Sequence, residues 1–137
     1  MLEKAILFAT KAHKGQKDKG GNCYILHPIR VMFYCEKEQE QITAVLHDVL
    51  EDTNKTQEDL KKAGFSDEII EAVVCLTKQK KEDYFDYIKR VKKNKIARVV
   101  KLADLKDNMN LKRLSNITEK DRLRVEKYKK AKELLEE

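Results

Sequence analysis

The stretch AVLHDVLEDT, residues 44–53, places a histidine and three carboxylates in a run that otherwise has the apolar spacing of a buried helix. On such a helix His47 and Glu51 are four residues apart. Asp48 and Asp52 have the same separation. Because side chains three or four residues apart lie on one face of a helix, we predict that these four polar groups form one cluster.

Three carboxylates at the C-terminal end of a helix are unfavourable unless their charge is compensated. Like charges repel at this spacing, and the helix dipole disfavours anions at this end, at a cost of ~1 kcal/mol or more in aggregate. A cation among the carboxylates would turn this cost into a gain. A bound divalent metal ion is the simplest candidate.

Two residues from other segments could complete a metal site. His27 begins a predicted helix in YILHP, and Asp104 stands in the apolar helix predicted for VVKLADLKDN. With His47 and Asp48 they would supply two nitrogen and two oxygen ligands. This mixture suits Mn²⁺ or Fe²⁺, with Zn²⁺ or Mg²⁺ less favoured. A water on such a metal becomes a nucleophile near neutral pH.

The alternative is that these four residues are ordinary buried polar groups. Each would then need a hydrogen-bond partner of its own. We favour the metal site because it satisfies all four groups at once. His13 has no comparable neighbours in the sequence, and we assign it to the class of core histidines with satisfied partners.

The composition favours an all-helical protein. Of 137 residues, 41 % are hydrophobic and 39 % charged, with only four glycines and one proline. We expect a single domain over residues 1–137. The net charge of +6 favours anionic partners. Three dispersed cysteines without a C-x-x-C pair, an amphipathic start and no long apolar run predict a cytoplasmic protein with no membrane partner.

Capping signals and apolar periodicity divide the chain into a bundle of seven to eight helices. Thr56, Ser66 and Thr118 have the form of helix N-caps, and Gly64 the form of a stop. We predict helices over residues 1–14, 27–37, 40–52, 57–63, 67–78, 82–94, 95–114 and 119–135.

Three motifs in this order carry a family resemblance: YILHP, VLHDVLED and VKLADLKDN. The pattern resembles HD-domain phosphohydrolases, and more narrowly the hydrolase domain of the RelA/SpoT family and the stand-alone small alarmone hydrolases. The match runs over residues 11–131. The resemblance implies an all-helical fold, a bound Mn²⁺ and removal of the 3′-pyrophosphate from guanosine tetra- and pentaphosphate.

The same resemblance implies roles for individual residues. The implied metal ligands are His27, His47, Asp48 and Asp104. Glu51 and Asp52 match the family's catalytic acidic pair, and which of them protonates and which orients water stays open. The implied substrate-binding residues are Lys19, Tyr24, Asn108 and Tyr128. For Asn108 the alternative is a helix-surface amide, and for Tyr128 it is a core aromatic.

The sequence departs from the family where the base is bound. Asp18 stands in place of an arginine that packs on guanine, and an acidic group there would repel phosphate. Cys23 replaces a proline before the tyrosine of YILHP, and Leu111 replaces a threonine. The metal-binding and hydrolytic parts are intact, whereas the base-binding part is altered.

We therefore expect a metal-dependent phosphohydrolase resembling guanosine-3′,5′-bis(diphosphate) 3′-pyrophosphohydrolase, without a synthetase domain. The alternatives are an HD hydrolase of another nucleotide or phosphoester, and a weakly active nucleotide-binding module. Seven basic residues between Lys89 and Lys101 form either a solvated face or an electrostatic funnel for phosphate. Nucleic acid is not an expected partner, and a homodimer is compatible with the sequence.

Overall fold

The computed structural model describes residues 1–137, and for Arg113 the backbone alone. Within this description the chain forms α-helices, one short 3₁₀ helix and no strand, apart from an isolated bridge between Lys17 and Cys23. The helices are α1 (Leu2–Ala12), α2 (Leu26–Phe33), α3 (Glu38–Leu46), α4 (Val49–Asp52), α5 (Gln57–Lys62), α6 (Asp67–Cys75), α7 (Tyr84–Lys92), α8 (Lys95–Asn108), η1 (Leu111–Arg113) and α9 (Glu119–Glu136).

The helix predicted through residues 40–52 is in fact broken, and that part of the prediction is wrong. Helix α3 ends at Leu46, and His47 and Asp48 form a turn before the single turn of α4. The His47 Nδ1–H donates to the Ala44 carbonyl, 2.6 Å away, and so satisfies a carbonyl at the end of α3. The break turns His47 into the core and leaves Glu51 exposed.

The helix predicted over residues 95–114 is also shorter than expected. Helix α8 ends at Asn108, and the Asn110 side chain accepts from the Lys112 N–H at the start of η1. An asparagine that bonds its own downstream backbone offers the chain an alternative to continuing the helix. Within α8, Val100 is buried and Val99 is half-buried.

The predicted caps are confirmed. The hydroxyl oxygens of Thr56 and Thr118 each accept from a backbone N–H three residues on, in capping boxes that begin α5 and α9. Ser66 caps α6 in the same way. Gly64 follows α5 with a φ of +94°, a conformation that favours glycine.

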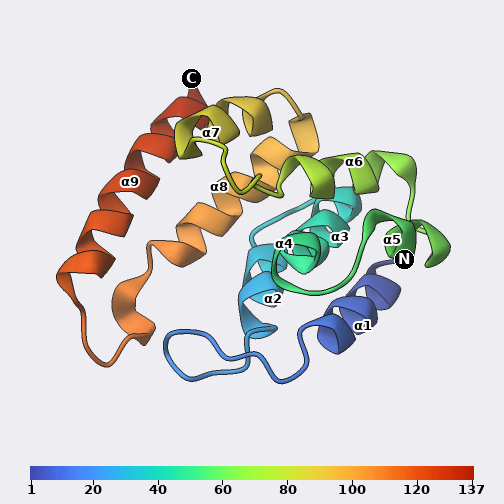
Figure 1. Ribbon diagram of the computed structural model, residues 1–137, viewed down its shortest axis with the longest axis horizontal. Helices are drawn as coiled ribbons and strands as arrows, with labels where there is room; N and C mark the ends of the chain where they lie inside the picture. The colour runs from blue at the N-terminus through green and yellow to red at the C-terminus, as the bar shows by residue number, and fades with distance from the viewer.

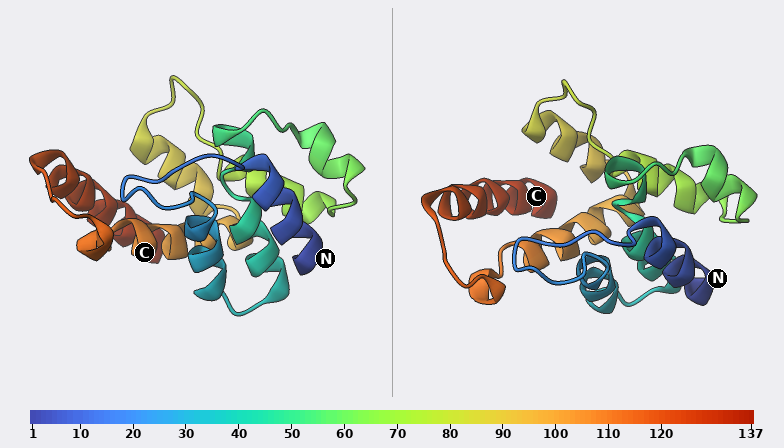
Figure 2. Two further views of the ribbon diagram at one scale, coloured as in Figure 1. Left: turned by 90° about the horizontal axis from the view of Figure 1, so that it is seen from below. Right: turned by 60° about the horizontal axis from the view of Figure 1, so that its bottom comes forward.

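Helix α3 lies at the centre of the bundle, in contact with α1, α2, α6 and α8 (Figure 1). Helix α9 packs against α7 and α8 on the other side of the molecule, as both views of Figure 2 show. The largest fully buried side chains include Leu46, Leu60, Ile88 and Leu105. This packing brings the N-terminus of α2, the C-terminus of α3 and the middle of α8 together.

None of the described helices is both long and apolar enough to cross a membrane.

Candidate metal centre and its pocket

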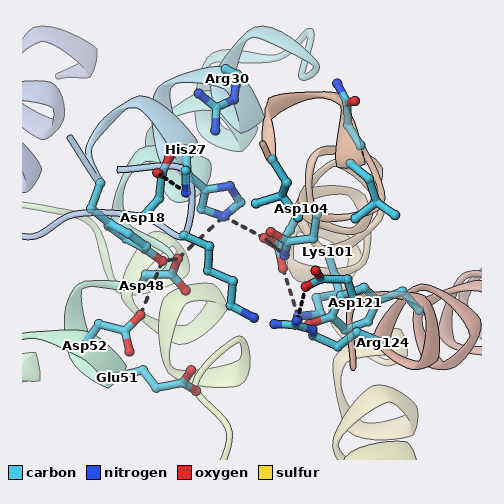
Figure 3. A pocket seen from close by; sticks show the side chains of 18 of the residues that line it. Asp18, His27, Arg30, Asp48, Glu51, Asp52, Lys101, Asp104, Asp121 and Arg124 are labelled. Atoms are coloured by element: carbon cyan, nitrogen blue, oxygen red, sulfur yellow. Dashed lines mark hydrogen bonds and ion pairs between the residues drawn. The ribbon is translucent and has the colours of Figure 1, made fainter. Parts of the chain in front are cut away.

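Four polar atoms converge where α2, α3 and α8 meet. The His27 Nε2 lies 2.9 Å from the Asp104 Oδ1, and the His47 Nε2 lies 3.3 Å from the same oxygen. The Asp48 Oδ2 completes the group at 3.1 Å from His47 and 3.7 Å from His27. These are the four residues that the sequence predicted as ligands, and Figure 3 shows His27 between Asp48 and Asp104.

Both imidazoles are held so that Nε2 faces the cluster. The His27 Nδ1 lies 2.7 Å from the Asp107 Oδ2, and the His47 Nδ1 lies 2.6 Å from the Ala44 carbonyl oxygen. A carboxylate and a carbonyl can only accept, so Nδ1 carries the proton in each ring. When Nε2 loses its own proton to a metal ion, its lone pair points toward the other ligand atoms.

The charges of the cluster fit a cation. Burial disfavours charge on His27, but its hydrogen bonds with Asp104 and Asp107 outweigh this and raise its pKa to about 9. Burial would raise the pKa of Asp48, but the facing His47 lowers it to about 2. Two carboxylates thus hold protons on two imidazoles, and a divalent ion can take the place of those protons. Nitrogen and oxygen donors in this number suit a divalent metal.

Two further side chains fix Asp104. Lys101, one helical turn earlier, places its Nζ 2.9 Å from the Asp104 Oδ2 and lies over the ring of Tyr87. The Asn108 Nδ2 donates to the Asp104 Oδ1 at 3.0 Å. The role of Lys101 beside Asp104 was not predicted from the sequence, although a lysine within the apolar VVKLAD run was a signal for it. Asn108, expected to contact nucleotide, contacts a candidate ligand and also lines the pocket.

The acidic pair of α4 lies beside the cluster. Oxygens of Asp48, Glu51 and Asp52 lie within 4.8 Å of one another. Burial and the nearby Asp48 raise the pKa of both Glu51 and Asp52, although the Lys78 N–H, which donates to the Glu51 Oε1 at 2.8 Å, opposes this for Glu51. A carboxyl with a raised pKa is suited to proton transfer near neutral pH.

These groups face a pocket of about 440 Å³. Its basic lining residues are Lys17, Lys19, Arg30, Lys78, Lys101 and Arg124. In Figure 3, Glu51 and Asp52 lie on one side of His27, and Lys101 and Arg124 on the other. Of the basic run between Lys89 and Lys101, only Lys101 reaches this pocket, so the rest of that run does not line it.

Known proteins resemble this chain in sequence. The chain is 32 % identical over 120 residues to guanosine-3′,5′-bis(diphosphate) 3′-pyrophosphohydrolase of Aquifex aeolicus, covering 79 % of this chain and 17 % of that protein. It is 40 % identical over 79 residues to the protein of the same name from Borreliella burgdorferi, covering 55 % of this chain and 12 % of that protein. No family model matches the chain.

A solved structure shares the fold. It belongs to a metazoan ortholog of SpoT that hydrolyzes ppGpp and plays a role in starvation responses, and it superposes with a TM-score of 0.82 at 24 % identity, covering 98 % of this chain and 84 % of that one. The chain is a RelA/SpoT-like HD domain. The predicted all-helical HD fold is therefore confirmed. The domain spans less than a fifth of the length of the curated relatives named above.

In the loop before α2, Asp18 makes contacts that were not predicted from the sequence. The Asp18 Oδ1 accepts from the backbone N–H groups of Gly20 and Asn22, each at 2.9 Å. Asp18 therefore closes its own loop, in addition to lining the pocket. Lys19, predicted to bind substrate, is exposed and lines the pocket.

Tyr24 contacts the candidate ligands directly. Its hydroxyl donates to the Asp48 Oδ2 at 2.5 Å and lies 3.4 Å from the Asp52 Oδ2. Burial and the adjacent Asp48 raise its pKa, so the phenol stays protonated and can donate. Tyr24, predicted to bind substrate, thus also holds a carboxylate of the candidate ligand cluster.

The far wall of the pocket is formed by α7 and α9. The rings of Tyr84 and Tyr128 lie 6.2 Å apart, and both line the pocket. Tyr128 is half-buried, so it packs as a core aromatic and also faces the pocket. Arg124, which the sequence analysis did not single out, forms an ion pair with Asp121 at the first turn of α9.

His13 is buried, as predicted, but only partly satisfied. Its Nδ1 lies 3.0 Å from the Gln16 Oε1, while its Nε2 has no hydrogen-bond partner among the described groups. Gln16 in turn donates to the backbone carbonyl of Asp52 at 2.8 Å. The expectation of a satisfied core histidine therefore holds for one ring nitrogen.

Proposed function

We propose that this domain hydrolyses guanosine-3′,5′-bis(diphosphate), releasing diphosphate from the 3′ position. The observation that carries the proposal is the convergence of His27, His47, Asp48 and Asp104 beside a pocket that both basic and acidic side chains line. Relatives that share 32–40 % of the aligned residues bear the name of this activity. Hydrolysis of another nucleotide or phosphoester is the principal alternative.

These four residues would hold one divalent metal, with Mn²⁺ the first expectation and Fe²⁺, Zn²⁺ or Mg²⁺ the alternatives. The bound ion would lower the pKa of water and offset charge on the phosphate. Every other contribution comes from the protein. Tyr24, Lys101 and Asn108 hold the carboxylates of Asp48 and Asp104 in place through the hydrogen bonds described above.

Glu51 and Asp52 would move protons. One carboxylate accepts a proton from the attacking water, and one carboxylic acid donates a proton to the ribose 3′-oxygen as the diphosphate leaves. The raised pKa of each group suits either role. The Lys78 N–H fixes the orientation of Glu51 by direct donation to its carboxylate.

The substrate phosphates would lie among the basic side chains of the pocket. Lys101 and Arg124 stand opposite the acidic pair, and Lys19 lies in the loop before α2. Tyr128 presents an aromatic face for the base or ribose, and Asn108 an amide within the same pocket. Cations on several sides match a nucleotide that carries phosphates at both the 3′ and 5′ positions.

The test is hydrolysis with Mn²⁺ across a panel of substrates. The panel contains guanosine tetraphosphate, other nucleoside phosphates, a dinucleotide phosphate and a generic phosphodiester, with Asp48→Ala as the control. Release of diphosphate from guanosine tetraphosphate, absent in the control, supports the proposal. Cleavage of another member only would redirect the assignment to that substrate. No cleavage with metal bound would favour a nucleotide-binding module.

A further inference from the structure

We propose that Asp107 and Arg30 are positioning residues of the metal centre, acting through His27. Asp107 fixes the His27 ring with Nε2 toward the other ligands, and Arg30 fixes Asp107. This inference rests on the metal site of the proposed function. It assigns a purpose to a partly buried ion pair that the hydrolytic mechanism does not use.

The contacts are close and lie in the interior. Asp107 follows Asp104 by about one turn of α8, and its side chain is 0 % exposed. Its Oδ2 accepts from the His27 Nδ1 at 2.7 Å, and its Oδ1 accepts from the Arg30 Nε at 2.8 Å. Both oxygens of the carboxylate are thus used, one for the histidine and one for the arginine.

The two ligand histidines are supported differently. His47 donates to the neutral carbonyl of Ala44, whereas His27 donates to a carboxylate. A carboxylate is the stronger acceptor and makes the ring a better electron donor to a metal. The metal affinity of the centre should therefore depend on Asp107 through His27.

Arg30 compensates the negative charge of the buried Asp107 carboxylate. A carboxylate buried beside Asp104 would be strongly destabilised without a cation. Arg30 stands one helical turn after His27 on α2, and its side chain is 28 % exposed at the pocket wall. His27, Asp107 and Arg30 therefore join α2 to α8, the two helices that supply His27 and Asp104.

The test measures the affinity for Mn²⁺ alone, with no substrate present. The concentration of free Mn²⁺ is monitored by its electron paramagnetic resonance signal. The variants are Asp107→Asn, Arg30→Met and the double substitution. We expect Asp107→Asn to weaken Mn²⁺ binding about 10- to 100-fold, the range found for supporting groups of metal ligands. Arg30→Met should weaken it less, and the double variant should match Asp107→Asn, because Arg30 acts through Asp107.

Asp121→Asn is the matched control. Asp121 is also a buried carboxylate with an arginine partner, but it has no contact with His27 or His47 in the structure. It should leave the Mn²⁺ affinity unchanged. Circular dichroism and thermal melts of the metal-free proteins report whether each variant folds. If Asp107→Asn does not fold, Arg30→Lys and Arg30→Met still test whether Arg30 acts on His27 through Asp107. The loss of Mn²⁺ affinity should be smaller for lysine than for methionine.

A spectroscopic measurement separates positioning from general destabilisation. In the Zn²⁺-loaded protein, nuclear magnetic resonance of ¹⁵N-labelled histidine should show the His27 Nδ1–H as a strongly hydrogen-bonded proton. Asp107→Asn should shift that signal and leave the His47 signal in place. Mn²⁺ affinity within twofold of the wild type in folded Asp107→Asn would overturn the inference. Wild-type protein that binds no Mn²⁺ would instead overturn the metal site beneath it.

Discussion

The Glu51 carboxylate accepts a hydrogen bond from the backbone N–H of Lys78, although 27 residues separate the two in the sequence. This contact fastens the acidic end of α4 to the loop between α6 and α7. A backbone donor holds the carboxylate in one orientation and opposes the rise of its pKa. The orientation of a candidate catalytic acid is therefore set by a loop that contributes no ligand.

Glu51→Gln should retain the metal and lose turnover. The amide keeps the size of the side chain but can no longer exchange a proton, and general acid–base groups contribute about 10²- to 10⁴-fold. Steady-state kinetics on guanosine tetraphosphate and Mn²⁺ binding should be measured on the same preparation. Turnover equal to the wild type would remove Glu51 from the mechanism.

Asp48→Ala should abolish stoichiometric Mn²⁺ binding. Asp48 approaches both His27 and His47, so its removal leaves the histidines without a facing carboxylate on that side. The readout is metal content after dialysis, together with the loss of any rise in melting temperature on adding Mn²⁺. Glu58→Ala, at an exposed carboxylate of α5, is the control and should bind metal normally. Retained metal in Asp48→Ala would exclude Asp48 as an essential ligand.

Arg90→Met should impair turnover without changing metal affinity. Arg90 donates to the carbonyls of Cys75 and Thr77 and pairs with Glu82, so it clamps the loop that carries Lys78. Loss of these bonds should lower the free energy of unfolding by about 2 kcal/mol and reduce kcat about tenfold by the loosened position of the catalytic acid.

Lys89→Met is the control for that prediction, because Lys89 lies on the same helix and is exposed. Urea unfolding, kcat and Mn²⁺ titration are compared across the three proteins. A fall in Mn²⁺ affinity for Arg90→Met equal to its fall in kcat would contradict a role confined to the loop.

Metal affinity should rise with pH toward about 9. Below its raised pKa of about 9, His27 carries a proton on the nitrogen that would bind the metal, so metal and proton compete. Without metal, the stability of the fold depends on pH in the opposite direction. The raised pKa of His27 contributes fully to the free energy of unfolding below pH 6.5, the pKa of an ordinary histidine, and this contribution is lost as pH rises through about 9. Mn²⁺ titrations at several pH values, in weak buffer to record proton release, test this. An affinity independent of pH would count against it.

Asp18→Ala and Asp18→Asn together distinguish two roles for the Asp18 carboxylate, loop closure and repulsion of phosphate. If Asp18 acts by closing its loop, alanine removes the acceptor for the Gly20 and Asn22 N–H groups and should raise KM, whereas asparagine keeps an acceptor oxygen and should stay near the wild type. If Asp18 acts by repelling phosphate, both substitutions should lower KM. Comparison of the two KM values decides between these roles.

Much of the fold could be predicted from local signals. The caps at Thr56, Ser66 and Thr118 each depend on one side chain that hydrogen-bonds a backbone N–H three residues on, so residue spacing alone predicts them. The ligand types were predictable because buried imidazole and carboxylate groups in apolar helices need a partner. The break between α3 and α4 was not, because it depends on which carbonyl the His47 ring reaches in three dimensions.

The supporting residues were missed for a related reason. Asp107 and Arg30 look like ordinary charges on helix surfaces, and only the packing of α2 against α8 brings them together. Asp18 was interpreted by its charge, whereas its hydrogen bonds to Gly20 and Asn22 are set by the turn of its own loop. Contacts between distant segments carry no periodic pattern that a sequence reader could use.

The bond from His47 to the Ala44 carbonyl has a consequence for mutational change. A main-chain carbonyl survives every substitution of Ala44 that keeps the helix intact, so no change of a neighbouring side chain can strip His47 of its acceptor. His27 has no such protection, because a single codon change removes the Asp107 carboxylate. Mutations can therefore change the metal affinity of the centre through the acceptor of His27. The acceptor of His47 belongs to the backbone and stays in place.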